Sequence, residues 1–266
     1  MSGDDHDRPW RREDAWQRLR ALTPARIALG RAGTGLPTAA LLEFQRAHAA
    51  ARDAVHAPFD AEPVRTALRA LGHPTMTVSS RAADRIEYLQ RPDLGRRLAD
   101  ADRERLAADD PADCDLAIVI GDGLSAIAAA THALPVVQRL LRSLPGHGIR
   151  PGPVIIAHQA RVALADEIGE RLQARQVLIL IGERPGLSSP DSLSGYLTWA
   201  PQVGRRDAER NCVSNIRPDG GLSYDAAAHT LIYLIREAQR RRLTGVALKD
   251  DSAGSPSLLA GTDTHS

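Results

Sequence analysis

The stretch DLAIVIGDGLSAIAAA, residues 115–130, decides the fold class of this chain. After Asp115 come five aliphatic residues in a row, a Gly-Asp-Gly turn, and a serine in front of an alanine-rich segment. An unbroken apolar run is typical of a strand that is covered on both faces, and serine is a favoured N-cap residue of helices. The stretch therefore predicts a buried strand that leads through a tight turn into a helix.

Two further apolar runs, residues 153–158 and 176–182, predict strands of the same kind. Helical segments connect the three strands: residues 125–144, which Pro135 bends or breaks, and residues 161–174. Alternation of strands and helices is the pattern of a parallel, doubly wound sheet. We therefore predict an α/β fold with a Rossmann-like parallel sheet.

The remaining segments extend this plan in both directions. Residues 196–201 (YLTWAP) and 244–249 (TGVALK) are candidates for additional strands, and residues 223–242 predict an amphipathic helix between them. Before the sheet, helical spacing of apolar residues predicts helices over residues 12–24, 38–55 and 63–72. We expect a mainly helical region over 1–110, a Rossmann-like domain over 111–250, and a flexible tail over 251–266.

Composition narrows the class of function. The 34 basic and 33 acidic residues give a net charge of +1, which favours a small ligand or a protein partner over nucleic acid or a membrane surface. No apolar segment reaches the roughly 18 to 20 residues of a membrane span, and the expected location is the cytoplasm. Cys114 and Cys212 are the two cysteines, and their spacing predicts neither a disulfide nor a metal site.

In a doubly wound sheet, ligands bind beyond the carboxyl ends of the strands. Here those ends are the sequences GDGLS, AHQARV and GERPGL. Ser125 has two interpretations, a phosphate contact or a helix N-cap, and the cap is favoured because serine commonly precedes apolar helices. Arg161 and Arg184 either contact an anion or are solvated surface arginines. No dinucleotide fingerprint and no G-x-S-x-G elbow is found in the sequence.

Seven short motifs in fixed order carry a family resemblance. They are TPARIALGRAG (residues 23–33), RPDLGRRL (91–98), DGLS (122–125), DEIGERL (166–172), GERPGL (182–187), SLSGY (192–196) and CVSNI (212–216). Together they resemble the small (light) subunit of adenosylcobalamin-dependent ethanolamine ammonia-lyase, over residues 23–249. Within the pattern, Gly195 stands where members often have cysteine, and the segment between Glu183 and Cys212 is about one residue shorter, so family contacts inside that interval are not carried over by position.

The resemblance implies a subunit of a hetero-oligomer. A large TIM-barrel subunit carries the catalytic groups, the small subunit supplies a face for base-on adenosylcobalamin, and a radical mechanism converts ethanolamine to acetaldehyde and ammonia. By position, the cobalamin contacts carry over onto Val162, Glu183 and Cys212. Val162 suits the flat apolar corrin, Glu183 suits its amide side chains, and Cys212 is small enough to pack closely. Arg161, Asp122 and Ser125 are further candidates by proximity.

Two questions stay open at this point. One competing interpretation is a corrinoid- or nucleotide-binding α/β module that serves a different partner, and another is a purely structural subunit that stabilises a barrel. The N-terminal segment 12–24 either directs the enzyme to a bacterial microcompartment or docks on the large subunit, through residues such as Trp16 and Leu19.

Overall fold

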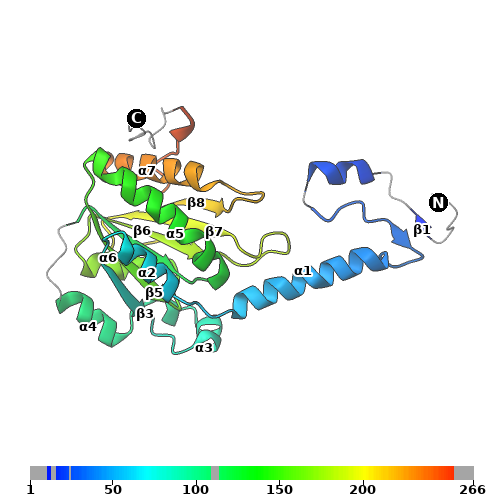
Figure 1. The fold of residues 1–266 in the computed structure, drawn as a ribbon, viewed down its shortest axis with the longest axis horizontal. Coiled ribbons are helices and arrows are strands. Elements are labelled where there is room, and N and C mark those ends of the chain that lie inside the picture. Colours follow the sequence, from blue (N-terminus) through cyan, green and yellow to red (C-terminus); the bar gives the residue numbers. More distant parts are fainter. Residues whose placement is uncertain (1–10, 13–15, 24, 109–113, 255–266) are drawn as a thin grey trace.

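The computed structural model describes residues 11–12, 16–23, 25–108 and 114–254, and its body is built on one six-stranded sheet (Figure 1). The strand order is β3-β5-β4-β6-β7-β8. The first four strands in this order are parallel, and β7 is antiparallel to both of its neighbours. The strands are β3 (Thr75–Ser79), β4 (Leu116–Gly121), β5 (Pro151–His158), β6 (Gln176–Gly182), β7 (Leu193–Trp199) and β8 (Arg210–Ile216).

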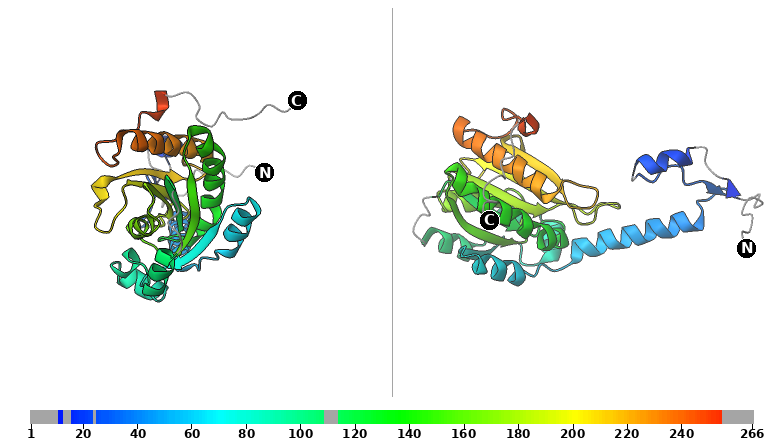
Figure 2. Two further views of the ribbon diagram at one scale, coloured as in Figure 1. Left: turned by 90° about the vertical axis from the view of Figure 1, so that its left-hand side faces the viewer. Right: turned by 45° about the horizontal axis from the view of Figure 1, so that its top comes forward.

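Helices cover both faces of this sheet, and Figure 2 shows the resulting layers. One core lies between the sheet and α2, α5 and α7, and a second lies between the sheet and α4 and α6. The α-helices are α1 (Thr38–His56), α2 (Glu62–Ala70), α3 (Arg85–Gln90), α4 (Asp100–Ala108), α5 (Ala126–Ser143), α6 (Leu164–Arg171) and α7 (Tyr224–Arg241). Short 3-10 helices are η1 (Gln17–Leu22), η2 (Leu94–Arg96), η3 (Leu144–His147), η4 (Asp207–Glu209) and η5 (Ser252–Gly254).

The predicted α/β class and the three central strands are confirmed. The sheet is mixed rather than wholly parallel, because β7 and β8 meet as an antiparallel pair. Helix α5 is continuous through Pro135. Burial of Ala133, Val136 and Val137 against the sheet stabilises the helix on both sides of the one hydrogen bond that proline cannot make.

One predicted strand beyond β7 is wrong, and the strand at that edge of the sheet, β8, was missed. Residues 244–249 form turns, because Gly245 has a φ of +86° and lies against the backbone of Ala208 and Glu209. The last strand is β8, which alternation of apolar residues does not predict, since Val213 and Ile216 are its only buried aliphatic residues. An edge strand with one open face needs few apolar positions.

The N-terminal region is less helical than predicted. Helices α1 and α2 form as expected, but residues 17–22 form a 3-10 helix, and β1 (Arg11–Arg12) pairs with β2 (Arg31–Ala32). Strand β3 belongs to the central sheet, where it pairs with β5, because its Thr-Met-Thr-Val-Ser sequence suits a pleated edge. Residues 255–266 of the predicted tail lie outside the described residues.

Helix α1 projects from the body as an arm, and β1, β2 and η1 lie at its far end (Figure 1). We call the described residues from 16 to 56 the arm. Most of its large apolar side chains are exposed, and Ala54 at the base is its one buried residue among those described. The arm exposes Trp16, Leu19, Leu22, Ile27, Leu36, Leu41, Leu42 and Phe44. Nowhere in the described chain is a helix both long and apolar enough to cross a membrane.

Candidate functional site

The sheet has a switch point at the carboxyl ends of β4 and β5. Strand β4 leads into α5 on one face, whereas β5 leads into α6 on the other, so the two connections diverge between neighbouring strands. Crevices of this kind bind ligands in open α/β sheets. The predicted site residues Asp122, Ser125, Arg161, Val162 and Glu183 all lie at or just beyond this edge of the sheet.

Asp122 holds the two sides of the switch point together. Its carboxylate accepts hydrogen bonds of 2.9 Å from the backbone N–H groups of Gln159 and Ala160, and Arg85 lies 3.8 Å away. Burial raises the pKa of Asp122, and these three donors oppose the rise. The carboxylate of Asp122 therefore makes internal contacts, which join the end of β4 to the end of β5.

Ser125 and the glycines around it join the end of β4 to the end of β6. Ser125 caps α5 by accepting from Ala128 N at 3.3 Å, which confirms the N-cap interpretation, and its hydroxyl donates to Pro190 O at 2.9 Å. Gly123 has a φ of +58°, and a Cβ there would lie 2.1 Å from Gly182 O. Only glycine permits this close approach of two backbones.

Beyond α6, the outer half of β7 and β8 presents an open face. Leu193, Leu197 and Val213 pack into the core on the α5 and α7 side. Because side chains alternate along a strand, Tyr196 lies on the opposite face, and its cross-strand neighbour Cys212 lies there with it. Cys212 is exposed, so this half of the sheet is accessible from outside.

Tyr196 connects two of the predicted site residues. Its hydroxyl donates to Glu183 Oε1 at 2.7 Å, and its ring lies beside Cys212. Burial and the hydrogen bond to Glu183 raise the pKa of Tyr196, so the hydroxyl stays a donor. Desolvation of the thiol likewise raises the pKa of Cys212, although the residue as a whole is exposed. Tyr196 is a site residue that the sequence analysis missed, although it ends the SLSGY motif.

Val162 and the two arginines take different positions around this face. Val162 is half-buried just before α6 and packs at the margin of the same core as Tyr196. The guanidinium of Arg161 lies 4.3 Å from the ring centre of Tyr88 and donates to its carbonyl oxygen. Arg184 is exposed. Among the described residues, neither arginine forms an ion pair with Glu183.

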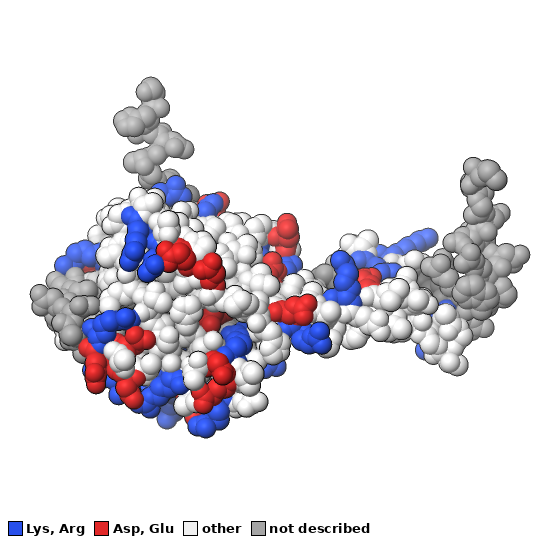
Figure 3. All heavy atoms as spheres, turned by 60° about the horizontal axis from the view of Figure 1, so that its bottom comes forward, with Lys and Arg blue, Asp and Glu red and all other residues white. Residues whose placement is uncertain are grey.

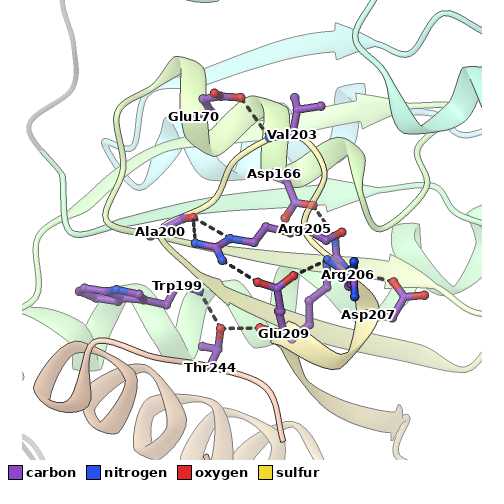
Figure 4. Close-up of polar contacts among 11 residues, drawn as sticks. Asp166, Glu170, Trp199, Ala200, Val203, Arg205, Arg206, Asp207, Glu209 and Thr244 are labelled. Atoms are coloured by element: carbon purple, nitrogen blue, oxygen red, sulfur yellow. Dashed lines mark hydrogen bonds and ion pairs between the residues drawn. The ribbon is translucent and has the colours of Figure 1, made fainter. Parts of the chain in front are cut away.

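A buried ion pair closes the inner half of the same face. Figure 4 shows Asp166, one partner of this pair, and the polar contacts around it. Arg210, at the beginning of β8, pairs with Asp166 of α6, and both side chains are 1% exposed. Arg210 also donates to Asp207 at 2.9 Å. Burial raises the pKa of Asp166 to about 6, and the nearby Arg210 opposes the rise. The pair holds the edge strand against α6, and further along the strands Tyr196 is half-buried and Cys212 is exposed.

These residues form a candidate site of one acceptor, one hydroxyl, one thiol and an apolar margin. The structure brings Val162, Glu183 and Cys212 to one face, and it places Asp122 and Ser125 inside the neighbouring loops. In the described part of the chain, no three His, Cys, Asp or Glu side chains gather in a way that would hold a metal ion. The arrangement suits contact with a large, partly apolar ligand.

Comparison with known proteins gives consistent matches. The family model "Ethanolamine ammonia-lyase light chain (EutC)" matches residues 13–249. A protein from Azotobacter vinelandii named "Ethanolamine ammonia-lyase small subunit" is 58% identical over 249 residues, which is 92% of each chain. Proteins with the same name are 57% identical in Xanthomonas campestris pv. campestris, over 95% of this chain and 93% of the relative, and 58% identical in Pseudomonas aeruginosa, over 90% and 89%.

Proposed function

Since this chain belongs to the ethanolamine ammonia-lyase light-chain family and is a small subunit of that carbon–nitrogen lyase, we propose that it forms one wall of a cobalamin site facing the large subunit. The observation that carries this proposal is the open half-face beyond α6. There Glu183, Tyr196 and Cys212 lie together, with Val162 at the margin. The resemblance that the sequence carries is confirmed at the level of family and enzyme.

The residues of this face fit the ligand by their chemistry. A corrin ring is flat and apolar, and its edge carries neutral amide side chains. Val162 and the ring of Tyr196 offer apolar contact, and the Glu183 carboxylate offers an acceptor whose orientation the Tyr196 hydroxyl holds. Cys212 is small, so the ligand lies close to the sheet beside it. When bound, adenosylcobalamin supplies the radical chemistry; the residues of this chain bind it, orient it and exclude water.

We propose base-on binding, in which the cofactor keeps its own dimethylbenzimidazole as the lower ligand. The Asp-x-His-x-x-Gly motif of proteins that replace this base is not found in the sequence. Electron paramagnetic resonance of the cob(II)alamin complex tests the proposal. Superhyperfine splitting from a protein histidine nitrogen, shown by isotopic labelling, would rule out base-on binding.

We further propose that the N-terminal region over residues 1–110 docks on the TIM-barrel large subunit. The arm exposes eight large apolar side chains in the described range, and Figure 3 shows much of its surface free of charged groups. Exposed apolar area of this extent marks a surface that another protein covers. In this proposal the arm anchors the small subunit, and the open half-face closes over the cofactor.

Co-expression with the large subunit tests the function as a whole. We expect the purified pair to show the visible spectrum of bound cobalamin and to release ammonia from ethanolamine, whereas this chain alone releases none. Cobalamin binding without lyase activity would favour a corrinoid-binding module that serves another partner. A stable pair in which only the large subunit is needed for cobalamin binding would favour a structural subunit. Location in the cytoplasm stays a prediction.

A further inference from the structure

The loop between β6 and β7 is held unevenly. We call residues 183–192 the β6–β7 loop, and the described residues after 56 the body. Side chains of the body bind the second half of the loop: Ser125 binds Pro190, His132 binds Asp191, and Arg217 binds Ser188 and Asp191. Residues 184–187, which directly follow Glu183, form no hydrogen bond with the rest of the body among the described residues. The part of the loop next to the candidate site therefore has the fewest hydrogen bonds to the body.

The arm supplies a contact that the body does not. Nη2 of Arg26 donates to Leu187 O at 3.4 Å, between residues 161 positions apart in the sequence. Arg26 is half-buried, and Figure 1 shows the β6–β7 loop reaching from the sheet toward the arm. The other hydrogen bond that joins arm and body in the described chain lies at the base of the arm, where Arg85 donates to Val55 O at 2.7 Å. Arg26 thus ties the arm to the loop far from that base.

This contact joins two of the seven ordered motifs. Arg26 lies in TPARIALGRAG, residues 23–33, and Leu187 ends GERPGL, residues 182–187. The predicted cobalamin contacts leave the first of these motifs without a role. Ile27 is 38% exposed and Leu187 is 37% exposed, so apolar surface on both sides of the hydrogen bond is open to a partner. A subunit that covers the apolar side chains of the arm would cover this contact with them.

We propose that Arg26 is a positioning residue, which couples docking of the arm on the large subunit to the conformation of the β6–β7 loop and so to cobalamin binding at Glu183. The inference rests on the function proposed above. A segment with few contacts loses conformational freedom when a ligand binds beside it, and this ordering costs free energy. Docking holds the arm in place, and Arg26 then holds residues 184–187 before the cofactor arrives, which reduces that cost.

Two variants of the small subunit, each purified with the large subunit, test this proposal. Arg26→Met removes the donor and keeps a long side chain. Arg31→Met is the matched control, because Arg31 lies in the same motif, carries the same charge and is exposed. For each complex we would measure the dissociation constant of adenosylcobalamin and the strength of subunit association. Hydrogen exchange of the cofactor-free complex would report separately on residues 183–187 and 188–192.

We expect Arg26→Met to raise the dissociation constant of adenosylcobalamin roughly five- to tenfold, since one hydrogen bond that orders the loop is lost. Amide exchange should become faster over residues 183–187 and stay unchanged over 188–192, where the contacts with the body remain. Arg31→Met should change neither quantity, and the two variants should associate equally well with the large subunit.

Three results would overturn the proposal. They are dissociation constants within twofold of each other for the two variants, unchanged exchange over residues 183–187 in Arg26→Met, and a loss of subunit association in Arg26→Met alone, which would make Arg26 only an anchor of the arm. A wild-type complex that binds no cobalamin would overturn the proposed function instead. In that case the exchange measurement still decides whether Arg26 holds the loop.

Discussion

The substitution Glu183→Gln removes one negative charge from the loop after β6 and keeps the size of the side chain. In the structure, Glu183 Oε1 accepts a 2.7 Å hydrogen bond from the Tyr196 hydroxyl. The amide oxygen of a glutamine can accept the same bond, so the fold should change little. The second carboxylate oxygen becomes an NH₂ group, which donates instead of accepting. A corrin amide that donated to this oxygen would therefore lose its acceptor.

The expected magnitudes differ for binding and for folding. A hydrogen bond from a neutral amide to a carboxylate contributes roughly 1.5 to 3 kcal/mol, and its loss corresponds to a 10- to 150-fold rise in the dissociation constant. For folding, the Tyr196 bond is weakened but not removed, and the half-buried carboxylate is partly hydrated. We therefore expect a cost of about 1 kcal/mol or less, which lowers the melting temperature by about 2–4 °C at most.

The assay is a titration of adenosylcobalamin into the cofactor-free complex with the large subunit, combined with its thermal unfolding. Arg184→Gln is the control, because Arg184 is the exposed neighbour and this substitution changes the local charge by one unit in the opposite direction. The control should bind cobalamin with nearly wild-type affinity. If Glu183→Gln binds as tightly as wild type while its complex melts markedly earlier, Glu183 is part of the scaffold and the reasoning is refuted.

Three further variants test other parts of the structure. Tyr196→Phe should weaken cobalamin binding about tenfold in the same titration, because the carboxylate that it orients becomes mobile; unchanged affinity would contradict this role. Arg210→Met should lower the free energy of unfolding by about 3–5 kcal/mol at pH 8, since it leaves Asp166 charged and buried. The pKa of Asp166 is raised to about 6 in the folded state, so in the wild type this residue makes the unfolding free energy fall as pH rises from about 4 to 6. At pH 5, where Asp166 takes up a proton, the variant should therefore lose much less stability than at pH 8. Equal losses at both pH values in denaturant titrations would contradict the assignment. The double variant Leu42→Ser, Phe44→Ser should leave the melting temperature of the isolated chain unchanged, because both side chains are exposed, and should weaken association with the large subunit in sedimentation experiments; unaltered association would argue against docking of this part of the arm.

Much of the central fold follows from short-range sequence patterns. The apolar runs that became β4, β5 and β6 are buried along their whole length or nearly so, and a strand covered on both faces must have such a run. The N-cap at Ser125 is equally local, because it depends on contacts within one helical turn. The seven ordered motifs identify the family for a related reason, since each is a short run of consecutive residues and can be recognised without knowledge of the fold.

The candidate site was predicted only in part. Val162, Glu183 and Cys212 were named through the family resemblance, and the structure then placed them on one face. Tyr196 was missed because its role depends on the register of β7 between two strands, which pairs it with Cys212 on one side and brings its hydroxyl to Glu183. The pairing register of two strands relates segments that are distant in the sequence, so no local pattern of residues predicts it.

The sequence by itself thus determined the α/β class, the three central strands, the long helices and the family. Only the tertiary structure decided that β8 forms the edge, that β3 joins the sheet from the N-terminal region, and that Asp166 and Arg210 close the inner half of the open face. It also decided the left-handed backbone of Gln159. The physical reason is common to all four features. Strand pairs, ion pairs and strained backbone conformations are held by contacts between segments distant in the sequence. Helix caps and buried strands are determined by residues close to one another in the chain.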